Sequence, residues 1–118
     1  MATVIKPSQA YLKFISLVQA VRELPGFPDM DALEERMLNL FAASWQRNQQ
    51  LTVLQAMDMV SGISPSTVHR RLKALRKKGL IALESDEIDN RVKYVVATER
   101  ANQYFTQLGR CLTKAVGR

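Results

Sequence analysis

The sequence predicts a mainly α-helical protein with a small β-hairpin, and three observations support this fold class. Apolar residues recur at spacings of three and four along most of the 118 residues, which is the period of an α-helix. After Gly79 the period changes to two, over the short runs 80–84 and 92–96. The composition, with 47% hydrophobic and 24% charged residues, is that of a globular protein. We therefore expect a single domain over 1–118, with four helices, a hairpin and a last helix.

The first and last helices are expected over 8–24 and 99–116. Ser8 is the expected N-cap of the first helix and Pro25 ends it, while Thr98 is the expected cap of the last helix. The apolar face of the first helix is broader than contact with one core requires, and the last helix carries a narrow apolar seam. These two faces favour a homodimer joined by the terminal helices. The alternative is that both helices pack on the core of their own chain.

The central segment 31–97 has the pattern of a helix-turn-helix followed by a wing. A short helix and a tight turn precede a second helix, which is expected over 65–78 between the N-cap Ser64 and the terminating Gly79. The hairpin follows at once and has a polar tip over 85–91. This order predicts a winged helix-turn-helix domain, flanked by the two terminal helices.

Helix 65–78 is expected to have one apolar and one basic face. Val68, Leu72 and Leu75 share a stripe that faces the core. No acidic residue occurs over 59–83, and such one-sided charge repels itself unless a polyanion neutralises it. Arg and Lys donate to guanine in the major groove, and Ser and Thr pair with several base edges. The alternative is a solvated basic face without a ligand. The residues that we expect to bind DNA from this helix and its cap are Ser64, Ser66, Thr67, His69, Arg70, Lys73, Lys77 and Lys78.

The hairpin tip 85–91 mixes both signs of charge. Arg91 is expected to enter the minor groove or touch a phosphate, with an acidic neighbour such as Asp89 fixing its orientation. The acids Asp86, Glu87 and Asp89 would also repel phosphate. A polar turn that binds nothing is therefore the alternative for this segment.

The net charge of +6 is placed unevenly along the chain. Residues 59–118 hold twelve Lys and Arg against five Asp and Glu, whereas residues 1–58 hold five against six. A basic half beside a neutral half favours a polyanionic partner, with nucleic acid as the first candidate. Charge alone is equally consistent with a basic surface that only aids solubility.

Several classes of protein are disfavoured. The single Cys111 and the single His69 cannot form a Cys/His zinc site or a disulfide, and they favour a reducing compartment such as the cytoplasm. We find no nucleophile–base pair, phosphate-binding glycine loop or paired carboxylates, so neither an enzyme nor a cofactor is expected. No run of about 18 apolar residues exists, so no membrane association is expected. Cys111 and Trp45 are expected in the core or an interface.

The runs SPSTVHRRLKALRKKGLI and DEIDNRVKYVVATERA resemble the MarR-type winged-helix transcriptional regulators, over roughly 33–110. Asp89 and Arg91 match the wing motif of that family, whereas Asn90 stands where the family has an arginine. The resemblance implies that 65–78 is the recognition helix and that the protein is a homodimer. It also implies a small phenolic or other aromatic effector.

These observations predict a sequence-specific regulator of transcription that binds double-stranded DNA, and more specifically a repressor that blocks promoter access. Two alternatives stay open. One is a plasmid or phage replication or partition factor that uses the same fold. The other is a winged helix that serves only protein–protein contacts, which the basic face disfavours because lysine is depleted in protein interfaces.

Overall fold

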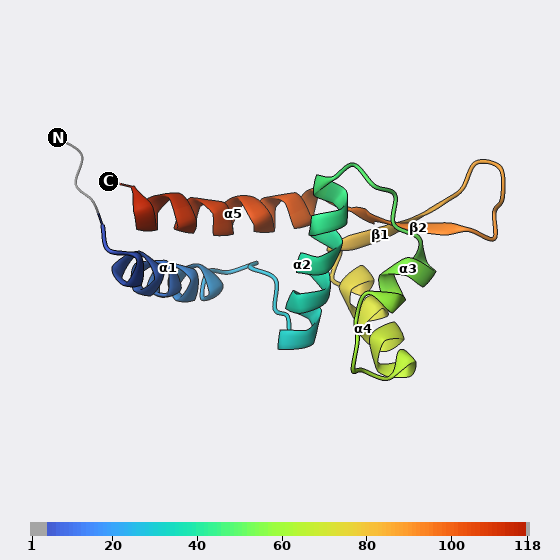
Figure 1. The fold of residues 1–118 in the computed structure, drawn as a ribbon, viewed down its shortest axis with the longest axis horizontal. Coiled ribbons are helices and arrows are strands. Elements are labelled where there is room, and N and C mark those ends of the chain that lie inside the picture. The colour runs from blue at the N-terminus through green and yellow to red at the C-terminus, as the bar shows by residue number, and fades with distance from the viewer. Residues whose placement is uncertain (1–4, 118) are drawn as a thin grey trace. The chain divides into compact units, whose positions relative to one another are not determined.

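The computed structural model describes residues 5–117, and the chain divides into two compact units. The winged unit comprises residues 30–101, and the terminal unit falls within 1–29 and 102–118. The single domain expected over 1–118 stays a prediction, and its outermost residues lie outside the described range. The elements are α1 (Pro7–Arg22), α2 (Ala32–Gln46), α3 (Val53–Asp58), α4 (Pro65–Lys77), β1 (Ile81–Ser85), β2 (Lys93–Ala97) and α5 (Glu99–Val116) (Figure 1). The predicted fold class, mainly helical with one hairpin, is confirmed.

The core of the winged unit is formed where α2, α4 and the hairpin meet. Its largest fully buried side chains come from all three parts of the unit, because α2 and α4 each turn one apolar stripe inward and the hairpin contributes from the start of β1 and the middle of β2. Burial of this apolar surface is the main force that holds α4 on α2. The side chains are Met37, Leu38, Phe41, Val68, Leu75, Leu80, Ile81 and Val95.

Helix α4 begins where its sequence signals predict and ends within one residue of the expected position. The Ser64 side chain accepts a hydrogen bond from the Thr67 amide, and Pro65 occupies the first turn. At the other end, Gly79 adopts φ +77°, and the Leu80 amide donates to the Leu75 carbonyl at 3.0 Å. This is the Schellman arrangement, which a glycine adopts without steric cost. Helix α4 is thus one residue shorter than expected, with Lys78 as its C-cap.

The hairpin pairs β1 with β2 antiparallel, with Leu83 opposite Val95. Both strands start and end one residue later than the alternation predicted, since alternation defines the inward face but not the last hydrogen bond. A third short segment joins this sheet, because Thr52 bridges Tyr94 and the Val95 amide donates to the Leu51 carbonyl at 2.7 Å. The sheet therefore fastens the start of α3 to the wing.

In the terminal unit, the expectations for the first helix are partly wrong. The N-cap is Lys6 and not Ser8, because Pro7 takes the first turn, where its missing N–H costs nothing. The helix also ends at Arg22, before the expected Leu24. The last helix has the expected bounds, and the Ala101 amide donates to the Thr98 hydroxyl as a cap should.

The terminal unit leaves much apolar surface exposed. Val18 is the one residue of α1 that is buried among those described, while Phe27 packs on Tyr104 of α5 with ring centroids 5.5 Å apart. Cys111 is buried, as expected. None of the helices in the described range is long and apolar enough to cross a membrane. The strongly exposed apolar residues of this unit are Tyr11, Leu12, Leu24, Leu112 and Val116.

A core truncation tests this packing. Phe41 is 0% exposed, so Phe41→Ala should lower the free energy of unfolding by about 3–5 kcal/mol through lost burial and an unfilled cavity. Leu54 is 76% exposed, and Leu54→Ala should change that free energy by less than about 0.5 kcal/mol. Urea unfolding with an unchanged slope measures both values. Equal effects of the two substitutions would contradict the described core.

Candidate nucleic-acid interface

The outer face of α4 carries the basic side chains that the sequence predicts. Arg70, Lys73 and Lys77 are exposed, as are Ser66 and His69. In the described part of the chain, no acidic side chain pairs with Lys73 or Lys77. This face therefore presents unneutralised positive charge and hydroxyl groups together, which is the chemistry that a major groove accepts.

A chain of hydroxyl groups runs from the cap of α4 to Arg70. The Ser64 hydroxyl donates to Thr67 Oγ1 at 2.8 Å, and Arg70 Nη2 approaches the same Thr67 oxygen at 3.4 Å. Ser66 Oγ lies 3.3 Å from Ser64 Oγ. The spacing of three residues puts these groups on one side of the helix, one turn apart. The cap residue and its neighbours thus hold the Arg70 guanidinium at the N-terminal half of α4, which enters a groove first in helix-turn-helix proteins.

Lys78 and Arg71 do not share this outer face. Lys78 Nζ donates to Glu34 Oε1 at 2.8 Å, and Arg71 Nη2 lies 3.0 Å from Asp31 Oδ2. Both acids belong to the start of α2. The sequence analysis assigned Lys78 to DNA and did not foresee that either acid pairs with a cation of α4. A helical wheel separates Lys78 from the outer face, since it falls about 20° from Arg71, at the edge of the apolar stripe.

The tip of the wing is held by two carboxylates. Asp86 accepts hydrogen bonds from the Ile88 and Asp89 amides, both at 3.0 Å, and from the Tyr94 hydroxyl at 2.7 Å. Asp89 accepts from Arg91 Nε at 3.0 Å and from Arg91 Nη2 at 3.1 Å. The Arg91 side chain nevertheless remains 91% exposed. The expected pairing of Arg91 with Asp89 is confirmed, and it orients the guanidinium while leaving it accessible.

These contacts shift the ionisation of the tip. The Asp89 amide, the Tyr94 hydroxyl and the Ile88 amide lower the pKa of Asp86 below its ordinary value. The Arg91 guanidinium and amide lower the pKa of Asp89, and Asp89 in turn raises the pKa of Arg91. Both acids are therefore ionised at neutral pH and satisfied inside the turn. Glu87 is the exposed acid of the tip.

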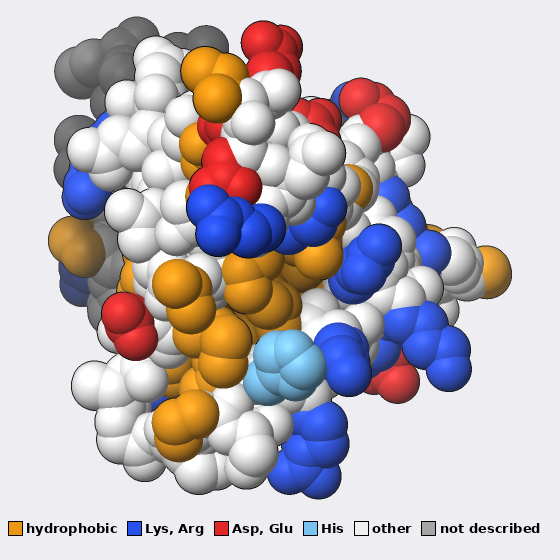
Figure 2. Space-filling model, turned by 90° about the vertical axis from the view of Figure 1, so that its right-hand side faces the viewer, with side chains coloured by type: hydrophobic (Ala, Val, Ile, Leu, Met, Phe, Trp, Pro, Cys, Tyr) orange, Lys and Arg blue, Asp and Glu red, His pale blue; other side chains and the backbone are white. Residues whose placement is uncertain are grey.

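The surface view shows how these charges gather. Figure 2 faces the wing end of the molecule and shows Lys and Arg side chains along one side, next to the histidine and a hydrophobic patch. Leu54 of α3 and Ile88 of the wing are the strongly exposed large apolar residues of the winged unit. The basic side chains thus border a surface that also offers apolar contacts.

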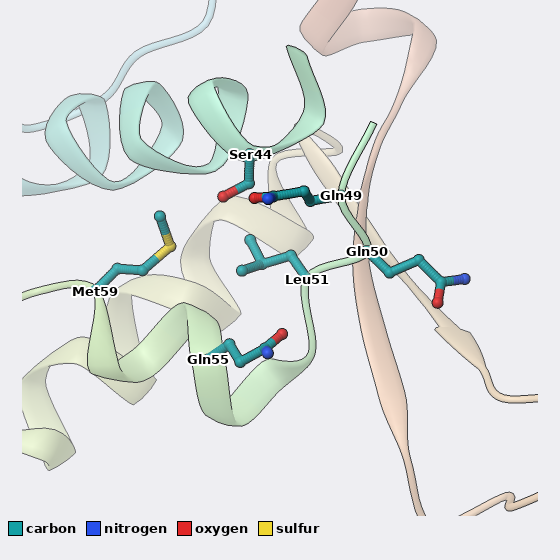
Figure 3. Close-up of a pocket in the computed structure, with 6 residues that line it drawn as sticks. All are labelled: Ser44, Gln49, Gln50, Leu51, Gln55 and Met59. Carbon is teal, nitrogen blue, oxygen red and sulfur yellow. The ribbon is translucent and has the colours of Figure 1, made fainter. Parts of the chain in front are cut away.

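A hollow of about 530 Å³ lies between the end of α2 and α3. Figure 3 shows Ser44 and Gln49 pointing toward each other, with Met59 and Gln55 contributed from the α3 side. The Gln55 amide is already used, because its oxygen accepts from the Thr52 amide in a capping box. In the described range, no group of three His, Cys, Asp or Glu side chains is placed to hold a metal ion.

Comparison with known proteins agrees with this geometry. Residues 46–82 match the family model of winged helix-turn-helix DNA-binding domains. None of the curated proteins matches the sequence significantly. Among solved structures, apo (heme-free) PefR shares 22% identity with a TM-score of 0.53, over 91% of this chain and 86% of that chain.

Two further structures are similar. A MarR-like transcriptional regulator from Thermotoga maritima shares 23% identity with a TM-score of 0.58, over 95% of this chain and 81% of that chain. A mutant MarR from E. coli, complexed with operator DNA, shares 18% identity with a TM-score of 0.53, over 93% of this chain and 66% of that chain. The chain therefore has a winged helix-turn-helix fold, which it shares with the MarR-like regulators.

The wing contacts can be tested by titration. The hydrogen bond to Asp86, together with burial and the negative charge of Asp86, raises the pKa of Tyr94 above 10.0. Asp86→Asn should bring the pKa of Tyr94 down toward its ordinary value, as followed by phenolate absorbance and assigned with Tyr94→Phe. Glu87→Gln, which removes an equal charge from the tip, should leave that pKa nearly unchanged. Because the pKa of Asp86 is lowered, its contribution to wing order is present above pH 3.8 and is lost as the pH falls through its folded value.

Proposed function

We propose that this protein binds double-stranded DNA sequence-specifically and regulates transcription, with α4 in the major groove. The observation that carries the proposal is the outer face of α4. There Arg70, Lys73 and Lys77 are exposed beside hydroxyl groups, with no acidic partner for either lysine in the described residues, inside a winged helix-turn-helix fold. Such a face is complementary to base edges and phosphates.

The three exposed cations of α4 are expected to contact different parts of the DNA, according to their position along the helix. Arg70 is near the N-terminal half of the helix and is steadied by Thr67, which suits a bidentate contact to guanine O6 and N7. Lys73 is one turn further along and can reach a base or a phosphate. Lys77 is at the end of the helix, where a flexible ammonium serves best as a phosphate contact. Ser64, Ser66, Thr67 and His69 supply further donors and acceptors around these cations.

Arg91 would act beside α4, from the wing. Its guanidinium is 91% exposed and fixed by two hydrogen bonds to Asp89, so it is preorganised for a narrow minor groove. The paired carboxylate also reduces its net attraction to phosphate. We therefore expect Arg91 to add orientation and affinity more than sequence preference.

Repression is the mode that needs the fewest assumptions. A protein bound over promoter DNA excludes the polymerase without further contacts, whereas an activator requires a surface that recruits it. Nothing in the interface resembles catalytic machinery, so we expect binding without chemistry. We expect the protein to act in the cytoplasm, because its single cysteine favours a reducing compartment. If the DNA sites that the protein binds in a genome lie at replication origins rather than at promoters, the replication or partition factor is favoured instead.

The apolar surface of the terminal unit supports a homodimer. Leu112 and Val116 are 54% and 57% exposed, and they lie four residues apart on one face of α5. On α1, Tyr11 and Leu12 are 63% and 62% exposed. Large apolar surfaces of this kind are usually covered by a partner, and a second copy would bring two recognition helices to one palindromic site.

A small aromatic effector, which the resemblance implied, would need an apolar cavity. One structure with a similar fold is that of PefR in complex with heme, so heme is the ligand of that protein. Four of the six residues that line the hollow near α3 are polar, namely one serine and three glutamines, whereas sites for aromatic ligands are lined mainly by apolar side chains. The effector therefore stays a prediction without an assigned site.

The decisive variant for base reading is Arg70→Ala. It should weaken binding to a preferred duplex by about 1–3 kcal/mol and relax the preference at one base position in each half-site. Arg36→Ala, an equal loss of charge at an exposed position of α2, should change neither quantity by a comparable amount. Titrations use a duplex selected by the wild type from a random library and a scrambled duplex of the same composition. If the folded Arg70→Ala variant keeps the base preference of the wild type, α4 does not read the bases.

Assembly is tested by light scattering. The wild type should have about twice the mass of one 13.4 kDa chain. Leu112→Lys combined with Val116→Lys should shift the equilibrium toward the monomer, because charge is costly in an apolar interface. Thr113→Lys, on a neighbouring exposed position, is the matched control and should remain dimeric. A wild-type monomer that binds the selected duplex tightly would contradict the dimer.

A further inference from the structure

Two carboxylates at the start of α2 cap this helix and also contact α4. Asp31 is the N-cap and Glu34 is the third residue of a capping box: Asp31 Oδ1 accepts from the Glu34 amide at 2.8 Å, and Glu34 Oε1 accepts from the Asp31 amide at 2.9 Å. Each of these two carboxylates also holds a cation of α4. Asp31 Oδ2 pairs with Arg71, and Glu34 Oε1 pairs with Lys78.

Capping alone does not require these charges. An asparagine caps a helix about as well as an aspartate, and a glutamine completes a capping box as well as a glutamate. The Glu34 side chain is only 3% exposed, so its negative charge is costly to bury. A buried ion pair of this kind is weak evidence for stability, because well-packed apolar residues often replace such a pair without loss. The charges therefore indicate a second role, which their partners on α4 identify.

The two partners hold α4 at two points. Arg71 and Lys78 are seven residues apart, which is nearly two turns and about 10 Å along the helix axis. The apolar stripe on α4 fixes which side faces the core, but apolar contacts have no direction and tolerate a small rotation or tilt. The Lys78–Glu34 contact is a charge-assisted hydrogen bond and is therefore directional. The Arg71–Asp31 ion pair holds the same edge of α4 at a second point, and a rigid helix held at two points is restricted in both movements.

We propose that Asp31 and Glu34, acting through Arg71 and Lys78, are positioning residues that set the orientation of α4 for base reading. This inference rests on the proposed function. A bidentate contact from Arg70 depends on the position of the helix to within a fraction of an ångström, whereas a flexible lysine on a phosphate does not. Loss of the Glu34–Lys78 pair therefore weakens discrimination between sequences far more than it weakens binding to DNA in general.

Glu34→Gln is the informative variant, because glutamine keeps the capping box and removes the charge. Binding to the selected duplex should fall about tenfold, as for one misplaced base contact, while binding to the scrambled duplex stays the same. If Lys78 instead contacts phosphate, freeing it from Glu34 would tighten binding to both duplexes. That result would overturn the proposal.

Lys78→Met completes the test from the other side of the pair. It should weaken binding to the selected duplex as much as Glu34→Gln does, with an unchanged salt dependence of binding. The double variant should bind the selected duplex no more weakly than either single variant. Lys77→Met is the neighbouring control: it should weaken both duplexes alike and lower the salt slope by about one unit. A salt slope that falls by about one unit in Lys78→Met would overturn the proposal, since it would make Lys78 a phosphate contact.

Conservative and folding controls separate positioning from simple destabilisation. Lys78→Arg retains the charge and should restore most of the discrimination, and thermal unfolding verifies that every variant is folded at the temperature of the titrations. A Lys78→Arg variant no better than Lys78→Met would count against the proposal. If the wild type prefers no duplex from the library, the proposed function fails. If the wild type discriminates and folded Glu34→Gln and Lys78→Met discriminate equally well, only the positioning role fails.

Discussion

Burial of the apolar stripe on α4 is the constraint on which the rest of the winged unit depends. Val68, Leu72 and Leu75 are at most 5% exposed, and their contact with the core leaves the opposite side of the helix in solvent. That side carries Arg70 and Lys73, so the same packing that stabilises the unit also presents its cations. A helix with this charge could not be buried on all sides, because unpaired ammonium and guanidinium groups are too costly to desolvate.

Around this helix, polar contacts supply the geometry that apolar burial does not. The Ser64 cap and the Gly79 turn define its ends, and the pairs with Asp31 and Glu34 lie along one edge. The sheet is tied to the rest of the unit in the same way, since Trp45 Nε1 donates to the Val95 carbonyl at 3.0 Å. Individually such bonds contribute little net stability, but each allows only a narrow range of positions.

The wing carries acidic residues beside a surface that we propose binds DNA, which is an anion. By charge alone, Asp86 and Asp89 would repel an anion, yet both accept hydrogen bonds from the tip itself. Asp86 closes the turn and anchors it to Tyr94, and Asp89 holds the Arg91 guanidinium outward. The tip is therefore ordered and its guanidinium is accessible, although the paired carboxylate offsets part of the positive charge of Arg91.

The helix order, the caps at Ser64 and Thr98 and the two faces of α4 were predictable from the sequence, because these depend on residues within one or two turns of each other. It misjudged the strand ends by one residue and the first N-cap, where Pro7 outweighs Ser8. The partner of Lys78 could not be predicted, since Glu34 lies 44 residues away and no local pattern links the two residues. The sequence also could not show which apolar residues of α1 and α5 remain exposed. A periodic apolar face has the same sequence pattern whether residues of its own chain or of another chain cover it.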